Sequence, residues 1–533
     1  MNHLAGTSSL VRLILRRDRL VLPLWIAVLA ALPLVTVVSF EELFPTETQR
    51  QGFFIATASQ PSYTGLLGPG FGASLGALAT QRAGILFLFV ALATLLTVIR
   101  HTRSEEETGR RELLGATVVG REAPLTAALL VACGASVLLG MLIAVSLAVG
   151  GLPLAGSVAF GGAIAATGCV FAAGGALVAQ LTEGAGAARG IALAVLGVVF
   201  LLRGAGDAAG ADGALRWLAW LSPIGWMQRT RAFADERWWV FLLALAAFAV
   251  LGLAAYALAS RRDVGAGVFP RRLGRAEAVP GLRRPLALAW RLHQGALWGW
   301  VGALAVLGVV IGAVSPDAAQ AMEDNEQLME LVRRLGGGAV VADAYLSAMM
   351  GFLGFVVSGY AVQATLRLRA EEESQRGELV LATSVHRLRW ALSHLCFALL
   401  GPTMALATLG VVAGVVYGAI VGDIGGQAPR ILAAALVQLP AAWLLAGVTM
   451  ALFGMRSSAA GLAWALLAAW LLLGQFGAVL QLPAWVLDLS PFSHLPPLPG
   501  GEVTVVPLLA LSGLAAAGIA FGLAALQRRD FGV

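Results

Sequence analysis

Long apolar runs alternate with short polar segments along the whole chain of 533 residues. A helix rises 1.5 Å per residue, so about 20 apolar residues cross the hydrocarbon core of a bilayer. The pattern predicts an all-α polytopic membrane protein of about twelve spans, six in each half. The predicted spans are residues 20–40, 83–99, 123–149, 157–180, 189–203 and 238–260, then 296–315, 345–365, 391–418, 428–452, 459–480 and 504–526.

One charged segment occurs twice between these spans. "RSEEETGRRELLGATVVGR" at 103–121 aligns without a gap with "RAEEESQRGELVLATSVHR" at 369–387, 266 positions later. Two further pairs share nearly the same offset, and they are "LSPIGW" (221–226) with "LSPFSH" (489–494), and "SRRDVGAG" (260–267) with "QRRDFGV" (527–533). The chain is therefore a tandem duplication. Each half has an even number of spans, so we expect the halves to be related by a pseudo-two-fold axis along the membrane normal.

The duplication predicts two transmembrane halves, residues 1–263 and 288–533. Residues 264–287 between them are rich in Gly, Pro and Arg, and they predict a cytoplasmic linker. Residues 7–19 and 284–295 mix Arg with Leu, Ile or Trp at the start of each half, which predicts helices lying at the membrane interface, with solvated tails as the alternative.

Composition strengthens the membrane assignment and narrows the chemistry. The chain is 59% hydrophobic and 12% charged, whereas soluble domains average about 25% charged. All 36 basic residues are Arg, so no P-loop is possible, because that motif requires Lys. We therefore expect no ATP hydrolysis on this chain. Cys133, Cys169 and Cys396 lie in apolar stretches and indicate neither a disulfide framework nor a metal site.

The arginines also predict the orientation. With both termini in the cytoplasm, 26 of the 36 arginines fall in inner segments, as the positive-inside rule requires. The sequence thus predicts a multi-pass protein of the cell membrane, and it explains the basic isoelectric point without nucleic acid. The spans hold few polar groups, which we expect neighbouring helices to satisfy, namely Gln180, Gln363, His394, Gln438 and Gln475. So little intramembrane charge argues against an ion-coupled secondary transporter, which remains an alternative.

The repeated acidic segment is the strongest candidate site. Its matched residues are Glu105, Glu106, Glu107, Arg110, Glu112 and Leu113, with Glu371, Glu372, Glu373, Arg376, Glu378 and Leu379. On an unbroken helix Glu105 and Glu112 would share a face, but Gly109 is a plausible break. The segments are either solvated helix surfaces at the membrane boundary or paired docking helices for two copies of a soluble partner. Catalytic or metal-binding carboxylates, as in an enzyme acting on lipid, are disfavoured because no metal-ligand spacing is present.

The pattern E-x-x-x-G-x-x-E-L-L resembles the cytoplasmic coupling segment of ABC-2-type permeases. Three longer stretches resemble the fused two-half branch that exports polyketide antibiotics in actinobacteria, and they are "RHTRSEEETGRRELLGATVVGREAPL" (100–125), "WLSPIGWMQRTRAFADERWW" (220–239) and "YALASRRDVGAG" (256–267). The resemblance implies export of hydrophobic or amphipathic, drug-like compounds. It also implies two copies of a separate ATP-binding subunit that holds ATP and Mg, with no cofactor on this chain. The second half departs from the pattern, because Gln375 replaces Gly109, so we expect the two docking helices to differ in orientation.

The outer segments contain the second candidate site. Trp217, Trp220, Trp226, Trp238 and Trp239 cluster in and beside residues 204–238, as in an interfacial aromatic belt. The ABC-2 resemblance implies instead a re-entrant hairpin that gates the exit, with breaks at Ser222–Pro223 and Ser490–Pro491. The candidate gate residues are Ser222, Pro223, Trp226, Ser490 and Pro491. Residues 317–335 predict a short amphipathic helix through Met322, Leu328, Leu331 and Leu335.

Overall fold

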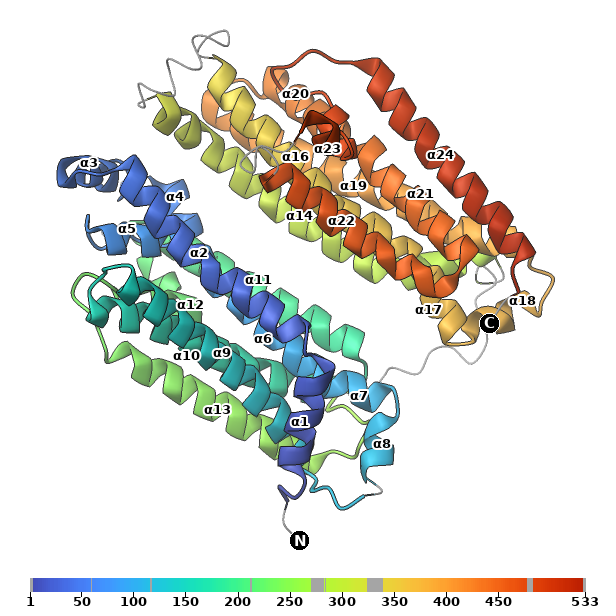
Figure 1. The fold of residues 1–533 in the computed structure, drawn as a ribbon, viewed down its shortest axis with the longest axis horizontal. Helices are drawn as coiled ribbons and strands as arrows, with labels where there is room; N and C mark the ends of the chain where they lie inside the picture. Colours follow the sequence, from blue (N-terminus) through green and yellow to red (C-terminus); the bar gives the residue numbers. More distant parts are fainter. Residues whose placement is uncertain are drawn as a thin grey trace. The chain divides into compact units, whose positions relative to one another are not determined.

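The computed structural model describes residues 3–58, 60–115, 117–210, 213–269, 282, 284–323, 339–476 and 483–530 (Figure 1). The chain divides into two compact units, Met1–Leu273 and Gly274–Val533, and each is considered by itself. The division falls inside the predicted linker, most of which lies outside the described residues. Residues 268 and 269 belong to the first unit, because their backbone N–H groups donate to Gln180 and Leu181 at 3.1 and 2.9 Å.

The first unit is built from helices with short connections. Its helices are α1 (Thr7–Arg17), α2 (Val21–Leu43), α3 (Glu47–Ala58), α4 (Pro61–Leu67), α5 (Leu75–Arg82), η1 (Ala83–Ile85), α6 (Leu86–His101), α7 (Arg103–Glu107), α8 (Arg110–Gly115), α9 (Ala123–Val149), α10 (Leu154–Leu181), α11 (Ala185–Ala208), η2 (Arg216–Leu221), α12 (Pro223–Gln228) and α13 (Val240–Arg261). One buried cluster joins α1, α2, α6, α9, α10 and α11 into a continuous apolar core.

The second unit is also built from helices, and its order of elements resembles that of the first. Its helices are α14 (Pro285–Glu323), α16 (Ala339–Thr365), α17 (Arg367–Glu373), α18 (Arg376–Leu381), α19 (Arg387–Val421), α20 (Ile424–Leu436), α21 (Leu439–Met455), η4 (Ser457–Gly461), α22 (Leu462–Phe476), α23 (Ala484–Leu487), η5 (Pro491–His494) and α24 (Val505–Arg528).

The structure confirms a polytopic all-helical protein. Within the described residues, eleven helical stretches are long and apolar enough to cross a membrane. The eleventh predicted span, 459–480, is represented by the shorter α22, and residues 477–482 lie outside the described part. The fifth span is longer than predicted, because α11 runs over 24 residues and includes two charged residues near its end.

The helix predicted at 7–19 is present as α1, whose polar and apolar residues lie on opposite faces. Its location at the membrane interface stays a prediction. Its predicted counterpart at 284–295 is wrong as a separate helix, because these residues continue without a break into the long α14. In the first unit α1 ends at Arg17, and Asp18 after it is buried and pairs with His101 at the end of α6. The predicted amphipathic helix at 317–335 lies largely outside the described residues.

Close backbone packing joins α9 and α10 at the centre of the first unit. A Cβ atom placed on Gly140 would lie 2.3 Å from the carbonyl oxygen of Gly161, and one placed on Gly161 would lie 2.3 Å from that of Gly140. Membrane helices associate through such small residues, since lipid offers no hydrophobic drive between them. The contact explains why both positions are glycine.

The two candidate sites lie at opposite ends of each unit (Figure 1). In the first unit, α7, α8 and the start of α1 lie at one end, and α3, α4 and α12 lie at the other. In the second unit, α17 and α18 lie at one end and α20 and α23 at the other. This separation is the arrangement required of a cytoplasmic docking segment and an outer gate.

Candidate coupling segments and outer gate

The first coupling segment, residues 103–115, is a helix, a left-handed residue and a second helix. Gly109 adopts φ = 72° between α7 and α8, a conformation that glycine reaches without steric cost. The predicted break at Gly109 is therefore present. Successive helical residues point about 100° apart, so Glu105, Glu106 and Glu107 face three directions. Their environments differ accordingly.

Glu106 is the buried centre of this segment. The exposed fraction of its side chain is 1%, and the fraction for Arg103 is 0%. Its Oε2 atom accepts from Arg103 Nη1 at 2.7 Å and from Arg262 Nη1 at 2.9 Å. Its Oε1 atom accepts from Arg262 Nη2 at 2.8 Å and pairs with Arg111. Three guanidinium groups thus surround one carboxylate, an arrangement that compensates for the cost of burying charge.

The same arginines connect α7 to the ends of two spans. Arg103 Nε donates to the carbonyl of Ala179 at 2.9 Å, and Arg262 Nε donates to Gln180 Oε1 at 2.7 Å, both near the end of α10. Arg121 Nη2 donates to the carbonyl of Arg262 at 2.7 Å, just beyond α13. Burial, followed by the charge of Arg262, lowers the pKa of Arg111 to about 10, so it stays charged at neutral pH. The segment is therefore fixed to α10 and α13 by charged hydrogen bonds.

The two flanking glutamates bind other elements. Glu105 pairs with Arg17 of α1 and lies 3.5 Å from Arg110. Glu107 Oε2 accepts from the backbone N–H of Ala185 at 2.9 Å, at the first residue of α11. A carboxylate is stabilised there by the helix dipole and by N–H groups that have no partner within the helix. The first acidic triad thus holds α1, α11 and α13 together.

The second coupling segment, residues 369–381, has the same backbone form. Gln375 replaces Gly109 but adopts φ = 58°, so the helix break is preserved. Glu372 Oε2 accepts from Arg529 Nη2 at 2.8 Å, as Glu106 does from Arg262. Arg387 Nη1 donates to the carbonyl of Arg529 at 2.7 Å, as Arg121 does to that of Arg262. Gln375 therefore preserves the turn. The expected difference in orientation between the two docking helices stays a prediction.

The two segments differ in the arginines at matched positions. Arg103 corresponds to Arg369, which is partly exposed and pairs with Glu373 at 2.6 Å instead of binding the buried carboxylate. Arg111 corresponds to Gly377. Glu371 pairs with Arg367 at 3.2 Å and with Arg376 at 3.8 Å. Glu372 pairs with Arg529 at 2.8 Å.

The residues that face away from each unit are those of the second short helix. Leu113 is 75% exposed and Leu379 is 74% exposed, and Glu112 and Glu378 beside them are also exposed. The structure thus divides the sequence-predicted residues into an inward group centred on Glu106 and Glu372 and an outward group. We call Glu112, Leu113, Glu378 and Leu379 the outward residues. The sequence did not distinguish these groups.

At the other end of the first unit, Ser222 and Pro223 begin α12. Ser222 is buried, and its hydroxyl accepts from the N–H of Gly225 at 3.4 Å, while Pro223 occupies the first helical turn. Trp226 Nε1 donates to the carbonyl of Trp220. In the second unit Ser490 precedes η5, and Pro491 is buried at its start. Both Ser-Pro pairs therefore lie at the start of a short helix. This position agrees with the helix breaks predicted at these two pairs.

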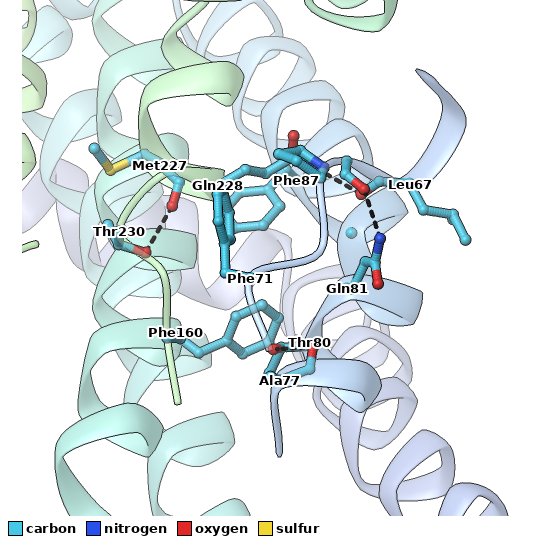
Figure 2. Close-up of a pocket in the computed structure, with 14 residues that line it drawn as sticks. Leu67, Phe71, Ala77, Thr80, Gln81, Phe87, Phe160, Met227, Gln228 and Thr230 are labelled. Atoms are coloured by element: carbon cyan, nitrogen blue, oxygen red, sulfur yellow. Dashed lines mark hydrogen bonds between the residues drawn. The ribbon is translucent and has the colours of Figure 1, made fainter. Parts of the chain in front are cut away.

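A small cavity of about 30 Å³ lies beside α12 in the first unit (Figure 2). Phe71, Phe87 and Phe160 line it together with two glutamines. Gln228 Nε2 donates to the carbonyl of Leu67, and Gln81 Nε2 donates to that of Gly68, each at 2.9 Å. Cavities for drug-sized ligands are about 300–1,000 Å³, so this space admits no more than a water molecule. This cavity is therefore too small for a drug-sized ligand.

The sequence did not reveal the buried charges that lie at this end of the first unit. Arg203 of α11 is 0% exposed and donates to the carbonyls of Gly65 and Leu66 at 2.8 and 2.9 Å. Asp207 is buried and accepts from Arg229 at 2.7 Å. The hydropathy pattern placed Arg203 at the edge of a short span, where a charge is ordinary. Arg203 and Asp207 are four residues apart, a spacing that places them on one face of a helix and could have indicated an ion pair.

In the part of the chain that the structure describes, no group of three or more His, Cys, Asp or Glu side chains is placed to hold a metal ion. The polar residues of the spans bind neighbours. Gln180 accepts from Arg262, Gln363 accepts from Trp300 Nε1 at 3.1 Å, and His394 lies 3.0 Å from His293. Three of the five polar residues predicted within the spans are therefore satisfied by neighbouring residues, as expected.

The comparisons with known proteins agree with this architecture. Residues 282–527 match the family model described as the C-terminal domain of the multidrug efflux system permease Rv1217c. The chain belongs to this family of multidrug efflux system permeases. The multidrug efflux system permease protein Rv1217c of Mycobacterium tuberculosis (strain ATCC 25618 / H37Rv) is 44% identical over 527 residues, which cover 98% of this chain and 95% of the relative.

Proposed function

We propose that this chain is the membrane-spanning permease of an ABC exporter that moves hydrophobic or amphipathic, drug-like compounds out of the cell. The family relationship supports multidrug efflux, and the ABC-2 resemblance of the sequence supports the fused two-half branch and a polyketide-type cargo. In this proposal two copies of a separate ATP-binding subunit bind ATP and Mg, and ATP hydrolysis takes place on that subunit and not on this chain.

One structural observation carries the docking part of the proposal. Each coupling segment ends in a short helix that presents an exposed acid and an exposed leucine, Glu112 and Leu113 or Glu378 and Leu379. Each short helix follows a segment fixed by a buried Glu–Arg pair to the last span of its unit. An exposed apolar residue beside a charge suits a protein interface. A push on α8 or α18 would therefore reach α13 or α24 through hydrogen-bonded contacts.

Affinity purification of the tagged chain from its own membranes tests the proposal. We expect mass spectrometry to identify an ATP-binding subunit at two copies per chain. The variant Glu112→Arg with Glu378→Arg should lose this subunit while inserting normally. The matched control is Glu47→Arg with Glu502→Arg, which reverses one exposed acid per half away from the coupling segments.

The control variant should retain the subunit, and the purified complex should hydrolyse ATP. Purification of the chain without an ATP-binding subunit in several detergents would contradict the proposal. Flux driven by a proton gradient and insensitive to ATP depletion would instead support the secondary transporter. Activity on lipid by the chain alone would support an enzyme.

A further inference from the structure

The last two turns of α11 carry a buried cluster of charges that reaches α12. The exposed fraction of the side chain is 0% for both Arg203 and Asp207. Arg203 Nη1 lies 3.6 Å from Asp207 Oδ2. Arg229 Nη2 donates to Asp207 Oδ1 at 2.7 Å, and the Arg229 side chain is only 14% exposed. One carboxylate and two guanidinium groups are therefore removed from water at the end of an otherwise apolar helix.

One guanidinium group joins α11 to two separate segments. Arg203 Nη2 donates to the carbonyls of Gly65 and Leu66 in α4, at 2.8 and 2.9 Å. Arg203 Nη1 donates to Gln228 Oε1 at the end of α12, at 3.2 Å. Arg229, which binds Asp207, follows Gln228 directly. Both α4 and α12 are thus held on α11 by charged hydrogen bonds. We call this set the polar joint, and its members are Arg203, Asp207, Gln228 and Arg229.

Backbones approach closely around the polar joint. A Cβ atom placed on Gly204 would lie 2.8 Å from the carbonyl oxygen of Gly65 in α4. A Cβ atom placed on Gly206 would lie 2.4 Å from the backbone nitrogen of Ala219 in η2, just before α12. The glycines of α11 therefore place α4 and η2 directly against its backbone, with the charges beside them.

The polar joint is poorly suited to increase stability. Asp207 Oδ2 and Arg203 Nε have no hydrogen-bond partner among the described residues. Replacement of a buried ion pair by apolar residues of similar volume is often neutral or stabilising. The second half shows that the charges are not required by the repeat, because the residues 268 positions after Arg203 and Asp207 are Leu471 and Gln475. The charges of the first half therefore need a reason other than stability.

Separation of the joined segments provides such a reason. An apolar contact that separates exposes apolar surface to water, which is unfavourable in proportion to its area. Charged groups and backbone carbonyls that separate regain the hydration that they lost on burial, which offsets the loss of their contacts. A polar joint therefore opens at a lower cost than an apolar contact of the same size, while it still fixes one closed arrangement.

The segments that the polar joint holds are also bonded to each other. Gln228 Nε2 donates to the carbonyl of Leu67 at the end of α4, at 2.9 Å. Beyond the two helices, Ser74 Oγ donates to the carbonyl of Phe233 at 3.1 Å. These bonds do not involve α11. We therefore expect α4 and α12 to stay together when their contacts with α11 break.

We propose that Arg203 and Asp207 are positioning residues for the candidate gate, which hold α4 and α12 against α11 and release both as one body during transport. The inference deepens the proposed function, on which its connection with transport rests. The joint belongs to the first half, because Leu471 and Gln475 carry no charge. The two halves therefore contribute unequally to this movement.

A disulfide across the polar joint tests whether it opens during transport. Cys133, Cys169 and Cys396 are first removed, and Gly65→Cys is combined with Ala208→Cys. A Cβ atom on Gly65 lies 3.2 Å from that of Ala208, close to the separation found in disulfides. Oxidation with copper phenanthroline should slow ethidium efflux from cells about tenfold or more, and dithiothreitol should restore it.

The matched control is a second tether, Gly72→Cys with Ala234→Cys. A Cβ atom on Gly72 lies 4.0 Å from that of Ala234, and this pair connects the segments that follow α4 and α12 without involving α11. Its oxidation should leave efflux unchanged, as should oxidation of Gly65→Cys or Ala208→Cys alone. A fully formed Cys pair across the polar joint with undiminished efflux would overturn the proposal.

Hydrogen–deuterium exchange of the purified chain tests the joint without an ATPase or a cargo. Asp207→Asn leaves two guanidinium groups without their carboxylate, so exchange should accelerate about threefold or more in residues 61–67 and 216–228 together. The oxidised tether between Gly65→Cys and Ala208→Cys should suppress the acceleration in both segments, although it touches only the first. The matched control is Asp235→Asn, an acid that is 62% exposed and pairs with Arg231, and it should change neither segment.

Acceleration in only one of the two segments, or in neither, would show that they do not open together at this joint and would overturn the proposal. If the tethered chain does not accumulate, Asp207→Asn and Asp235→Asn decide the question by themselves. Failure of the unmodified chain to move ethidium concerns the proposed function alone, because the exchange measurement needs no transport.

Discussion

Individual glutamates in the two acidic triads have separate tasks, although the sequence presents them as one motif. Glu106 and Glu372 are buried and paired with arginines that follow the last span of each unit. Glu112 and Glu378 are exposed. A consecutive run of acids on a helix must face several directions, so the sequence alone could have indicated that the triad would divide. It could not indicate which member would be buried, because that depends on where Arg262 and Arg529 lie in space.

The buried pairs predict unequal losses of stability. Glu106→Gln leaves three guanidinium groups without their carboxylate, and loss of one partner of a buried pair costs about 3–5 kcal/mol. Glu372→Gln removes the acceptor of Arg529, which is only 13% exposed, but the second unit has Gly377 in place of Arg111, and its Arg369 pairs with Glu373. Thermal unfolding in detergent should therefore show a larger fall for Glu106→Gln than for Glu372→Gln.

Glu112→Gln serves as the control for that comparison, because substitutions at exposed positions usually change stability by less than about 0.5 kcal/mol. An unfolding temperature for Glu106→Gln equal to that of Glu112→Gln would show that the buried cluster contributes no net stability.

At the scale of helices, the coupling segments depend on one left-handed residue each. A Cβ atom added to Gly109 would have no neighbour within 4 Å. A side chain there would therefore be strained only by the backbone φ of 72°. Gly109→Val should cost about 1–2 kcal/mol of local stability. Hydrogen–deuterium exchange of residues 103–115 should therefore accelerate in this variant.

The reciprocal change, Gln375→Gly, meets no such penalty because glycine adopts φ = 58° freely. Exchange of residues 369–381 should change little in that variant. Acceleration in Gln375→Gly as large as that in Gly109→Val would show that the side chain of Gln375, not the backbone conformation, maintains the turn.

The α9–α10 contact gives a second prediction at this scale. Alanine usually stabilises a helix relative to glycine, by roughly 0.5–1 kcal/mol. Gly161→Ala should instead destabilise by about 1–3 kcal/mol, because its Cβ would lie 2.3 Å from the carbonyl of Gly140. Gly174→Ala, on the same helix with nothing within 4 Å, is the control and should be neutral or stabilising. Unfolding temperatures in detergent that rank the two variants in the opposite order would contradict this packing.

The helices were predictable where hydropathy alone decides them and less so where charge intervenes. The span 123–149 coincides with α9, because no charged residue interrupts it. The span 189–203 was drawn too short, because Arg203 and Asp207 lower the local hydropathy, yet the structure buries both through Arg229 and backbone carbonyls. The continuity of α14 was missed because an amphipathic pattern was taken for a separate helix. Residues 284–295 look amphipathic, but nothing in them ends a helix.

At the scale of the whole molecule, the duplication determines which ends of the two units must face the same side of the membrane. Each coupling segment lies at the opposite end of its unit from the Ser-Pro segment (Figure 1). A tandem repeat with an even number of spans keeps both halves in one orientation. The distribution of arginine then predicts that the coupling end faces the cytoplasm.

This orientation predicts the labelling of single cysteines in a background that lacks Cys133, Cys169 and Cys396. Glu47→Cys and Glu502→Cys should react with a membrane-impermeant maleimide in intact cells, because both residues are exposed outside the long apolar helices. Glu112→Cys and Glu378→Cys should react only after permeabilisation. Labelling of Glu112→Cys and Glu378→Cys from opposite sides would mean an inverted repeat. A single ATPase pair could not then reach both segments, and the docking proposal would fail together with the parallel arrangement of the halves.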